Sequence, residues 1–442
     1  MGDIYKQFAN PLIETMHPHL RRLSVITATL LISLSCPLQV VGNIWGSNAA
    51  LAQAQTRKQR NEEALRQALR LYQVGVQQYQ QGQFRGALDT FQTVLVIFRE
   101  IEEIQGESST LGSIGLVYNN LGQYPKALEY FQQALAIFKA IGNKVGEGRT
   151  LGSIGLVYGN LGQYPQALEY FQQALAIAKA IGDKATEGAT LNNIGFLYRN
   201  LGQYPQALEN YQQALAIAKA IGDSSGEGTS LNNIGSVYDS LGQYPKALEN
   251  YQQSLAIAKA IGDKAQEGRT LNNIGVVYNT QGNYSQAETT LFAAIEAWES
   301  IRSRDLKDDQ KISIFDTQAG SYRFLQQALV AQNKFDQALF IAERSRGRAL
   351  VELLDSKLSQ KTSNQLNLKP PNLQGIKQIA SQQNATLVQY SVGYEPFKVQ
   401  GKQEWQQKLY IWVIKPTGEI AFKQVDLKKS LVLPDLICRI NS

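Results

Sequence analysis

Histidine and cysteine are scarce in this chain, and their positions limit the chemistry that it can perform. Among 442 residues there are two of each: His17 and His19 lie near the N-terminus, and Cys36 and Cys438 lie toward opposite ends. Isolated cysteines cannot form a disulfide framework or a zinc site. A thiol nucleophile needs an activating base or a cationic neighbour, and no histidine follows His19. We therefore expect no catalytic residues, no bound metal and no cofactor.

Charge is modest and unevenly divided. Residues 53–301 hold 19 Lys and Arg against 22 Asp and Glu, whereas residues 302–442 hold 21 against 13. The basic C-terminal third indicates a solvated surface, or contact with an acidic partner or an anionic membrane surface. No known nucleic-acid motif or basic-aromatic patch accompanies it, so nucleic acid is not an expected partner.

One long apolar run lies near the N-terminus. Arg21 and Arg22 precede the run Leu23–Val41, and small residues follow at Ala50-Leu51-Ala52. A charged region, an apolar region and an A-x-A site in this order are typical of a secretory signal peptide. Residues 1–52 are therefore predicted to direct export, with cleavage before Gln53.

The same run has an alternative interpretation. Its length approaches the ~20 residues that cross a bilayer, so residues 23–41 can instead serve as an uncleaved membrane anchor. A start at Met16 rather than Met1 gives a shorter, more typical charged region. The predicted location is periplasmic or extracellular, with membrane anchoring as the main alternative and a cytoplasmic fate as a further one.

The middle of the chain repeats every 40 residues. The sequence Leu-Gly-Gln-Tyr-Pro begins at Leu121, Leu161, Leu201 and Leu241, and a weaker copy begins at Gln281. A fixed period of this size indicates stacked supersecondary units rather than one globular core. Such stacks expose extended surfaces, which favours a binding function.

Each repeat reads as two helices. Apolar residues at helical spacing mark their buried faces: Leu151, Ile154, Tyr158 and Leu161 in the first, and Leu168, Phe171, Leu175 and Ala178 in the second. Gly162 can end the first helix in a left-handed conformation, and Pro165 suits the first turn of the second. Gly155 recurs in every repeat although glycine inside a helix costs roughly 1 kcal/mol, which predicts a close helix–helix approach. The tyrosines of the turns are expected to pack: Tyr124, Tyr164, Tyr204 and Tyr244.

These positions resemble the tetratricopeptide repeat. The matching residues are Ile154-Gly155, Tyr158, Ala167-Leu168, Phe171 and Ala174. The 40-residue period and the Gly-Asp-Lys-Ala-x-Glu-Gly return loop are similar to the kinesin light chain-like subclass. The resemblance covers residues 67–301. It implies a mostly α fold, a right-handed α-solenoid of helix hairpins whose first helices line a concave surface.

The predicted domain organisation follows from the repeat boundaries. After residues 1–52 come capping helices and a degenerate repeat over 53–105, five repeats over 106–301, and a degenerate repeat or cap over 302–356, with a turn at Gln332–Phe335. Residues 357–375 are rich in Ser, Gln, Asn and Pro and read as a linker. Residues 376–442 form a small α/β module, with a helix at Ile376–Ala380, strands at Leu387–Val392, Leu409–Ile414 and Glu419–Val425, and a turn at Pro416-Thr417-Gly418.

The last third resembles the start of a CHAT domain, a caspase-like fold found behind such repeats in cyanobacterial proteins. The resemblance rests on Glu343–Leu350, Leu387–Ser391 and Leu409–Val413. Proteolytic members use a His–Cys dyad, and no residue here can supply the histidine. We expect a truncated, non-catalytic module with an apolar face or strand edge left uncovered, which a partner completes or which leaves the module marginal.

The candidate binding residues are the polar first-helix positions outside the apolar stripe. They are Asn120, Asn160, Asn192, Asn193, Asn200, Asn232, Asn233, Asn272, Asn273, Arg149, Arg199, Asp239 and Arg269. Amides repeated at one height can donate to and accept from an extended peptide backbone, and arginines can select carboxylates. The alternative is that some of these asparagines bond to neighbouring helices.

The predicted function is that of a non-catalytic scaffold. It would bind an extended peptide or protein on the concave surface, outside the cytoplasm. The chaperone-binding members of the family use a clamp of Lys and Asn, but those places hold Gly or Asn and Leu116, Leu156, Phe196, Ser236 or Val276, so a chaperone C-terminus is not an expected partner. The alternative function is a regulatory or relic partner of a CHAT-type cysteine peptidase, itself lacking the dyad.

Overall fold

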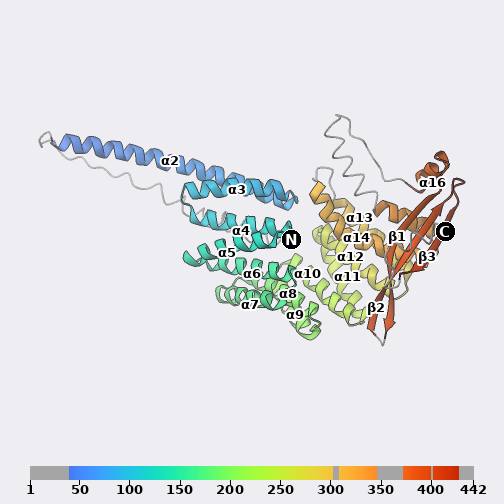
Figure 1. Ribbon diagram of the computed structural model, residues 1–442. Helices are drawn as coiled ribbons and strands as arrows, with labels where there is room; N and C mark the ends of the chain where they lie inside the picture. The colour runs from blue at the N-terminus through green and yellow to red at the C-terminus, as the bar shows by residue number, and fades with distance from the viewer. Residues whose placement is uncertain (1–38, 302–307, 346–371, 400–401, 428–442) are drawn as a thin grey trace. The chain divides into compact units, whose positions relative to one another are not determined.

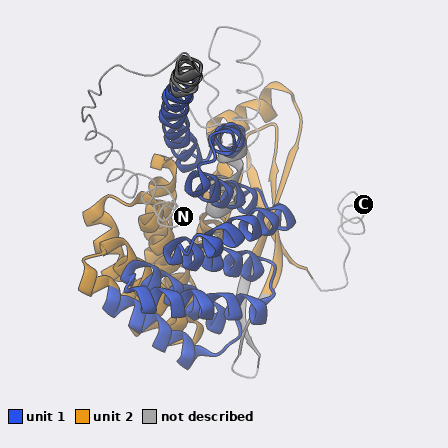
Figure 2. Cartoon of the chain, turned by 90° about the vertical axis from the view of Figure 1, so that its left-hand side faces the viewer, with its two compact units in different colours: residues 1–217 blue, residues 218–442 orange. Residues whose placement is uncertain are grey.

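The computed structural model describes residues 39–301, 308–345, 372–399 and 402–427 (Figure 1). The chain divides into two compact units, residues 1–217 and 218–442 (Figure 2). The predicted signal segment up to residue 38, both histidines, both cysteines and most of the predicted linker lie outside the described residues. Within the described residues, no helix is both long and apolar enough to span a membrane.

Unit 1 consists of helices joined by short turns. They are α2 (Gln39–Gln80), α3 (Phe84–Glu100), α4 (Ile104–Asn120), α5 (Tyr124–Ala140), α6 (Lys144–Asn160), α7 (Tyr164–Ile181), α8 (Lys184–Asn200) and α9 (Tyr204–Ile221). The boundary between the units falls within α9, so its last residues belong to unit 2. α2 runs through the predicted cleavage position after Ala52. Its second half pairs with α3, as the predicted degenerate repeat requires.

Unit 2 continues the hairpins and ends in a small sheet. Its elements are α10 (Ser224–Ser240), α11 (Tyr244–Ile261), α12 (Lys264–Thr280), α13 (Tyr284–Ile301), α14 (Asp308–Ala331), a helix over residues 335–345, α16 (Leu373–Gln382), β1 (Leu387–Val399), β2 (Lys402–Ile414) and β3 (Ile420–Asp426). The five predicted repeats correspond to the hairpins α4–α5, α6–α7, α8–α9, α10–α11 and α12–α13. The prediction of a mostly α stack of hairpins is confirmed.

The turn within each hairpin forms as the glycine predicts. Gly162 has φ +73°, and its backbone N–H donates to Gly159 O at 3.0 Å while Gln163 N donates to Tyr158 O at 2.9 Å. The return loop ends at an N-cap, because the Asp183 side chain accepts from Thr186 N at 3.0 Å. The left-handed glycine reverses the chain within a hairpin. A capping side chain begins the next hairpin at α6 (Asn143), α8 (Asp183), α10 (Asp223) and α12 (Asp263).

Gly155 faces a ring rather than a backbone. A Cβ at this position would lie 2.9 Å from Cδ1 of Phe171, which is buried in the facing helix. The same relationship joins Gly115 to Phe131 and Gly195 to Tyr211. The close approach predicted from the recurring glycine is therefore present, but an aromatic side chain of the second helix makes it.

Each unit has a side formed by its first helices, here called the first-helix face: α4, α6 and α8 in unit 1, and α10, α12 and α14 in unit 2. Successive first helices approach one another more closely than successive second helices do. That difference is expected where the first helices lie on the inner side of a curved stack. The turn tyrosines Tyr124, Tyr164 and Tyr244 are half-buried against the hairpin cores, as predicted.

The three strands form an antiparallel sheet in the order β1-β2-β3. Tyr410, Trp412 and Ile414 of β2 share one buried cluster with α13, α14, α16 and the helix over residues 335–345. Trp412 Nε1 donates to Phe335 O at 3.0 Å, and Ser391 Oγ bonds to Gln326 Oε1 at 2.9 Å. One face of the sheet therefore packs on the last hairpin of unit 2, while Val388 on the other face is 51% exposed.

Two predictions for this region need correction. The predicted linker extends to residue 375, but α16 already begins at Leu373, because the Asn372 side chain caps it by accepting from Gly375 N at 2.7 Å. The strands are at the predicted places, but β1 and β2 are longer than predicted, because Lys402 to Gln407 continue the pairing with β1. The turn at Gly418, with φ +83°, is confirmed.

Candidate functional site

Several asparagines of the first-helix face bond to the next first helix. Asn273 Nδ2 donates to Asn232 Oδ1 at 3.1 Å, and Asn160 Nδ2 donates to Asn119 Oδ1 at 3.2 Å; each pair is 41 residues apart. Asn120 Nδ2 donates to the Tyr79 hydroxyl across the same separation. For these residues the alternative interpretation is confirmed, since their amides connect repeat to repeat.

In unit 2 the asparagines extend into the interior. Asn232 is only 7% exposed and also accepts from Thr270 Oγ1 at 3.3 Å. Thr270 in turn accepts from Gln266 Nε2 at 3.3 Å. Asn272 Oδ1 accepts from Ser321 Oγ at 2.8 Å, which joins α12 to α14. Asn232 and Asn272 are therefore part of the packing between first helices.

The two arginines near first-helix starts differ in their surroundings. Arg149 Nη2 lies 3.5 Å from Asp183 Oδ2, and both side chains are only 16% exposed. Because Asp183 also caps α8, this ion pair ties α6 to the start of the next first helix. Arg269 occupies the equivalent place in α12 and is exposed.

The first-helix face of α6 and α8 carries an apolar centre with polar edges. The side chain at the central position is almost buried in Leu116 (3% exposed), half-buried in Leu156 and 43% exposed in Phe196. Arg199 lies over the Phe196 ring at 5.2 Å from its centroid, and its Nη2 is 3.4 Å from Asn200 Oδ1. These contacts hold a guanidinium beside an exposed aromatic ring.

Glycines and asparagines surround this apolar centre. Gly152 in α6 has open space where a side chain would stand, since nothing lies within 4 Å of its Cβ position. Asn193 is half-buried, and Asn192 Nδ2 lies 3.5 Å from Gly188 O. We call this set the α6–α8 surface: Gly152, Leu156, Gly159, Asn160, Asn193, Phe196, Arg199 and Asn200. The sequence analysis did not predict Phe196 as a binding residue. The feature that could have identified it is an aromatic residue at a position where the other repeats have Leu, Ser or Val.

Asp239 lies near the end of α10, on the first-helix face of unit 2. Burial raises the pKa of its carboxyl to about 6. The pKa of the Tyr244 phenol is raised by its own burial and, to a smaller extent, by the charge of Asp239. Its carboxylate makes no hydrogen bond or ion pair with another residue that the structure describes. Asn279, at the equivalent position one repeat later, does have a partner: its Nδ2 donates to Phe324 O at 3.3 Å.

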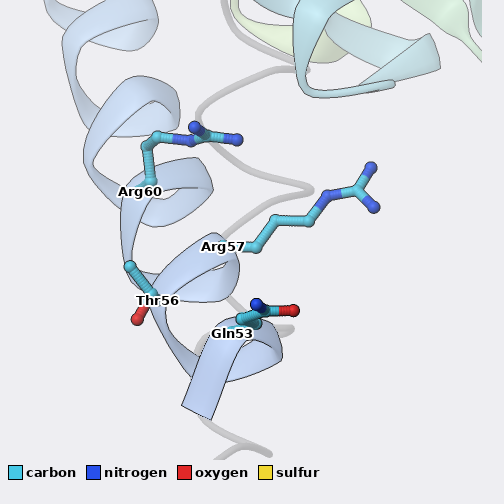
Figure 3. Close-up of a pocket in the computed structure, with 4 residues that line it drawn as sticks. All are labelled: Gln53, Thr56, Arg57 and Arg60. Atoms are coloured by element: carbon cyan, nitrogen blue, oxygen red, sulfur yellow. The ribbon is translucent and has the colours of Figure 1, made fainter. Parts of the chain in front are cut away.

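A surface hollow of about 320 Å³ lies beside the first part of α2 (Figure 3). Gln53, Thr56, Arg57 and Arg60 line it, and all four are exposed side chains of one helix. Arg57 Nη2 lies 3.9 Å from Glu102 Oε1. The hollow is open, solvated surface rather than an enclosed site. Among the described residues no group of three or more His, Cys, Asp or Glu is placed to hold a metal ion.

Comparison with known proteins identifies the repeats. The sequence model of the family described as "Tetratricopeptide repeat" matches residues 67–140, 106–180, 186–260 and 241–300, which together exceed half of the chain. Tetratricopeptide repeat protein 28 of Homo sapiens is 31% identical over 152 residues, covering 33% of this chain and 6% of that protein. The Mus musculus protein of the same name is 32% identical over 139 residues, covering 30% and 5%. The chain thus spans a small part of the length of these curated relatives.

The comparison with solved structures finds matches at low identity. The crystal structure of BtubC (BKLC) from P. vanneervenii is 18% identical, covers 52% of this chain and 97% of that chain, and has a TM-score of 0.42. Repeats of the matched family typically act as scaffolds for protein interactions, and such proteins are generally non-catalytic. On the residues matched, this chain belongs to the tetratricopeptide repeat family.

Proposed function

We propose that this chain is a non-catalytic scaffold that binds an extended segment of another polypeptide on the α6–α8 surface of unit 1. The observation that supports this most is Phe196, a 43% exposed aromatic side chain among asparagines, glycines, Leu156 and Arg199. Exposed aromatics surrounded by polar residues are frequent anchors of protein interfaces. Burying such a side chain stabilises a complex by about 2 kcal/mol before the entropy losses of association.

The polar groups around Phe196 fit a peptide ligand. The Asn193 amide can donate to and accept from a peptide backbone, and the Arg199 guanidinium can pair with a carboxylate. The missing side chain of Gly152 leaves open space on the same face of α6. The surface thus offers an apolar anchor, a backbone partner and a charge in a small area.

Selection of peptides from a random display library on the full chain, followed by calorimetry, tests this function. Phe196→Ala is expected to weaken a selected peptide by at least tenfold. Leu161→Ala is the matched control, because Leu161 is similarly exposed (41%) but stands at the hairpin turn beyond this surface. Equal losses in both variants, or no loss in Phe196→Ala, would place binding elsewhere.

The place of action proposed is outside the cytoplasm. Support comes from the sequence alone, in the order of charged residues, apolar run and small residues over 1–52. N-terminal sequencing of the protein from the periplasmic or extracellular fraction is expected to begin near Gln53. An intact N-terminus in the membrane fraction would favour the anchor through residues 23–41 instead.

Two finer family assignments are also proposed. The 40-residue period and the return loops capped by Asp183, Asp223 and Asp263 support the kinesin light chain-like subclass. The strands at Leu387, Leu409 and Ile420 support the resemblance to the start of a CHAT domain, and with it the alternative role as a regulatory or relic partner of a CHAT-type peptidase. Co-expression with such a peptidase and measurement of its activity tests that role: an unchanged rate would argue against it.

A further inference from the structure

Asp239 is a carboxylate held partly out of water without a partner among the described residues. It is half-buried at the next-to-last position of α10, and no described residue bonds to its side chain. Taking an ionised carboxylate out of water is unfavourable unless a counter-charge or hydrogen-bond donors replace the lost hydration. A half-buried carboxylate that the fold itself does not satisfy is therefore a candidate site for an external cation or donor.

No ion pair joins Asp239 to a described residue of α11 or α12, the two helices of unit 2 that pack against α10. On α11, Lys246 Nζ lies 5.3 Å from the centroid of the Tyr238 ring. Tyr244 contributes a phenol whose pKa is raised by burial first and by the charge of Asp239 second. On α12, the charged residues Glu267 and Arg269 belong to its first turns, while the residue level with Asp239 is Asn279, one repeat later. The side chains nearest along α10 itself, Ser236 and Ser240, are small hydroxyls.

We propose that Asp239 binds a cationic side chain, an arginine or a lysine, of a polypeptide lying on the first-helix face of unit 2. This inference rests on the proposed function, since it assumes that such faces bind polypeptide. A partly desolvated carboxylate forms stronger, charge-assisted hydrogen bonds than a fully solvated one.

The proposal also sets a pH dependence. Only the ionised carboxylate attracts the cation, and burial raises the pKa of Asp239 to about 6 in the absence of ligand. Above that pH the site is charged and binding is strongest. At pH 5 roughly one carboxyl in ten is ionised, so the apparent affinity for a basic peptide is expected to fall about tenfold from its value at pH 7.5.

Parallel peptide selections on the full chain and on its Asp239→Asn variant test the proposal. Peptides selected by the wild type at pH 7.5 are expected to be enriched in Arg or Lys at one position, and those selected by Asp239→Asn are not. Fluorescence anisotropy then compares one selected arginine peptide with its citrulline counterpart, which keeps the shape but not the charge. The wild type should prefer arginine at least tenfold at pH 7.5, and Asp239→Asn should bind both alike at all pH values.

The outcomes separate this inference from the proposed function. The inference alone is overturned if every selected peptide depends on Phe196 and none on Asp239, or if the preference for arginine is equal in both proteins. If neither protein selects any peptide, the proposed function fails and the inference fails with it. Circular dichroism of Asp239→Asn checks that the helices are retained, as expected for a side chain that bonds to none of the described residues.

Discussion

The Asn273 side chain donates a hydrogen bond to Oδ1 of Asn232 at 3.1 Å, across 41 residues of sequence and one repeat of the stack. This hydrogen bond connects α12 to α10. Asn232 Oδ1 also accepts a second hydrogen bond, from the Thr270 hydroxyl. The Asn273 amide, which the sequence suggests as a ligand-binding group, therefore links two repeats through a hydrogen bond. The residue at the equivalent repeat position in unit 1, Asn193, is half-buried and makes no such bond with a described residue.

Asn273→Ala and Asn193→Ala are therefore expected to have different effects. Removing the Asn273 donor leaves a buried acceptor with one fewer partner, which should lower the stability of unit 2 by about 1 kcal/mol. Asn193→Ala should change stability by less than about 0.5 kcal/mol, as surface substitutions usually do, and should weaken peptide binding instead. Native-state hydrogen exchange of α10 and α12 measures the first effect and calorimetry the second. Equal protection in both variants would contradict the assignment.

Local patterns in the sequence were enough to predict the hairpins. Apolar residues at helical spacing, Gly162 at the turn and Asp183 at the return loop act within a few residues of themselves, so helix positions follow from short windows. The roles of the asparagines could not be predicted in this way. Asn193 and Asn273 have the same neighbours, Leu-Asn-Asn-Ile-Gly, and differ only in what the adjacent repeat presents to them.

The exposure of Phe196 and the extent of the sheet depend on packing as well. Leu116 and Phe196 occupy equivalent places, yet one is buried and the other exposed. β1 and β2 continue through polar residues such as Gln403 and Gln406 because their backbones pair, and side-chain alternation gives little sign of this. Cross-strand hydrogen bonding, rather than hydrophobicity, fixes those ends.

Gly155→Ala is expected to destabilise unit 1 even though alanine favours helices. The added methyl would stand 2.9 Å from the Phe171 ring, and overpacking of this kind typically costs 1–3 kcal/mol, against roughly 1 kcal/mol gained in helix propensity. Thermal unfolding followed by circular dichroism measures the difference.

Gly152→Ala is the matched control in the same helix. Nothing lies within 4 Å of its Cβ position, so the propensity gain should act alone and stabilise the protein by up to about 1 kcal/mol. A stabilised Gly155→Ala variant would show that the ring moves aside freely and that the glycine is not needed for packing.

Trp412 should anchor the sheet to the last hairpin of unit 2. Trp412→Phe removes the donor to Phe335 O while keeping an aromatic ring, and should cost on the order of 1–3 kcal/mol. Trp412→Ala should cost about 3–5 kcal/mol, because the side chain is fully buried. Hydrogen exchange of β2 and of residues 335–345 is expected to increase in both variants.

Val388→Ala tests the opposite face of the same sheet. Val388 pairs with Val413 and is 51% exposed, so truncation should change exchange very little. If Val388→Ala loosens the sheet as much as Trp412→Phe does, the attachment of the sheet depends on both faces.

Asp239→Asn should stabilise unit 2 in a pH-dependent manner. Burial raises the pKa of this carboxyl from an ordinary value near 3.8 to about 6 in the folded chain, so its ionisation opposes folding. The protonated Asp239 carboxyl does not oppose folding, so the wild type has its full free energy of unfolding below about pH 4. Part of that free energy is lost as the pH rises through 6 and the carboxyl ionises. At pH 7.5 the neutral amide should therefore be more stable by on the order of 1–2 kcal/mol, after allowance for partial exposure.

The advantage of Asp239→Asn should shrink between pH 6 and pH 4 and vanish below, which chemical denaturation at several pH values measures. Glu249→Gln on the exposed face of α11 removes one negative charge from the same unit and controls for a change in net charge. A stability gain of Asp239→Asn that persists unchanged at pH 4 would mean that the side chain acts through its shape rather than its ionisation. The cation site inferred for Asp239 would then lose the desolvated carboxylate on which it depends.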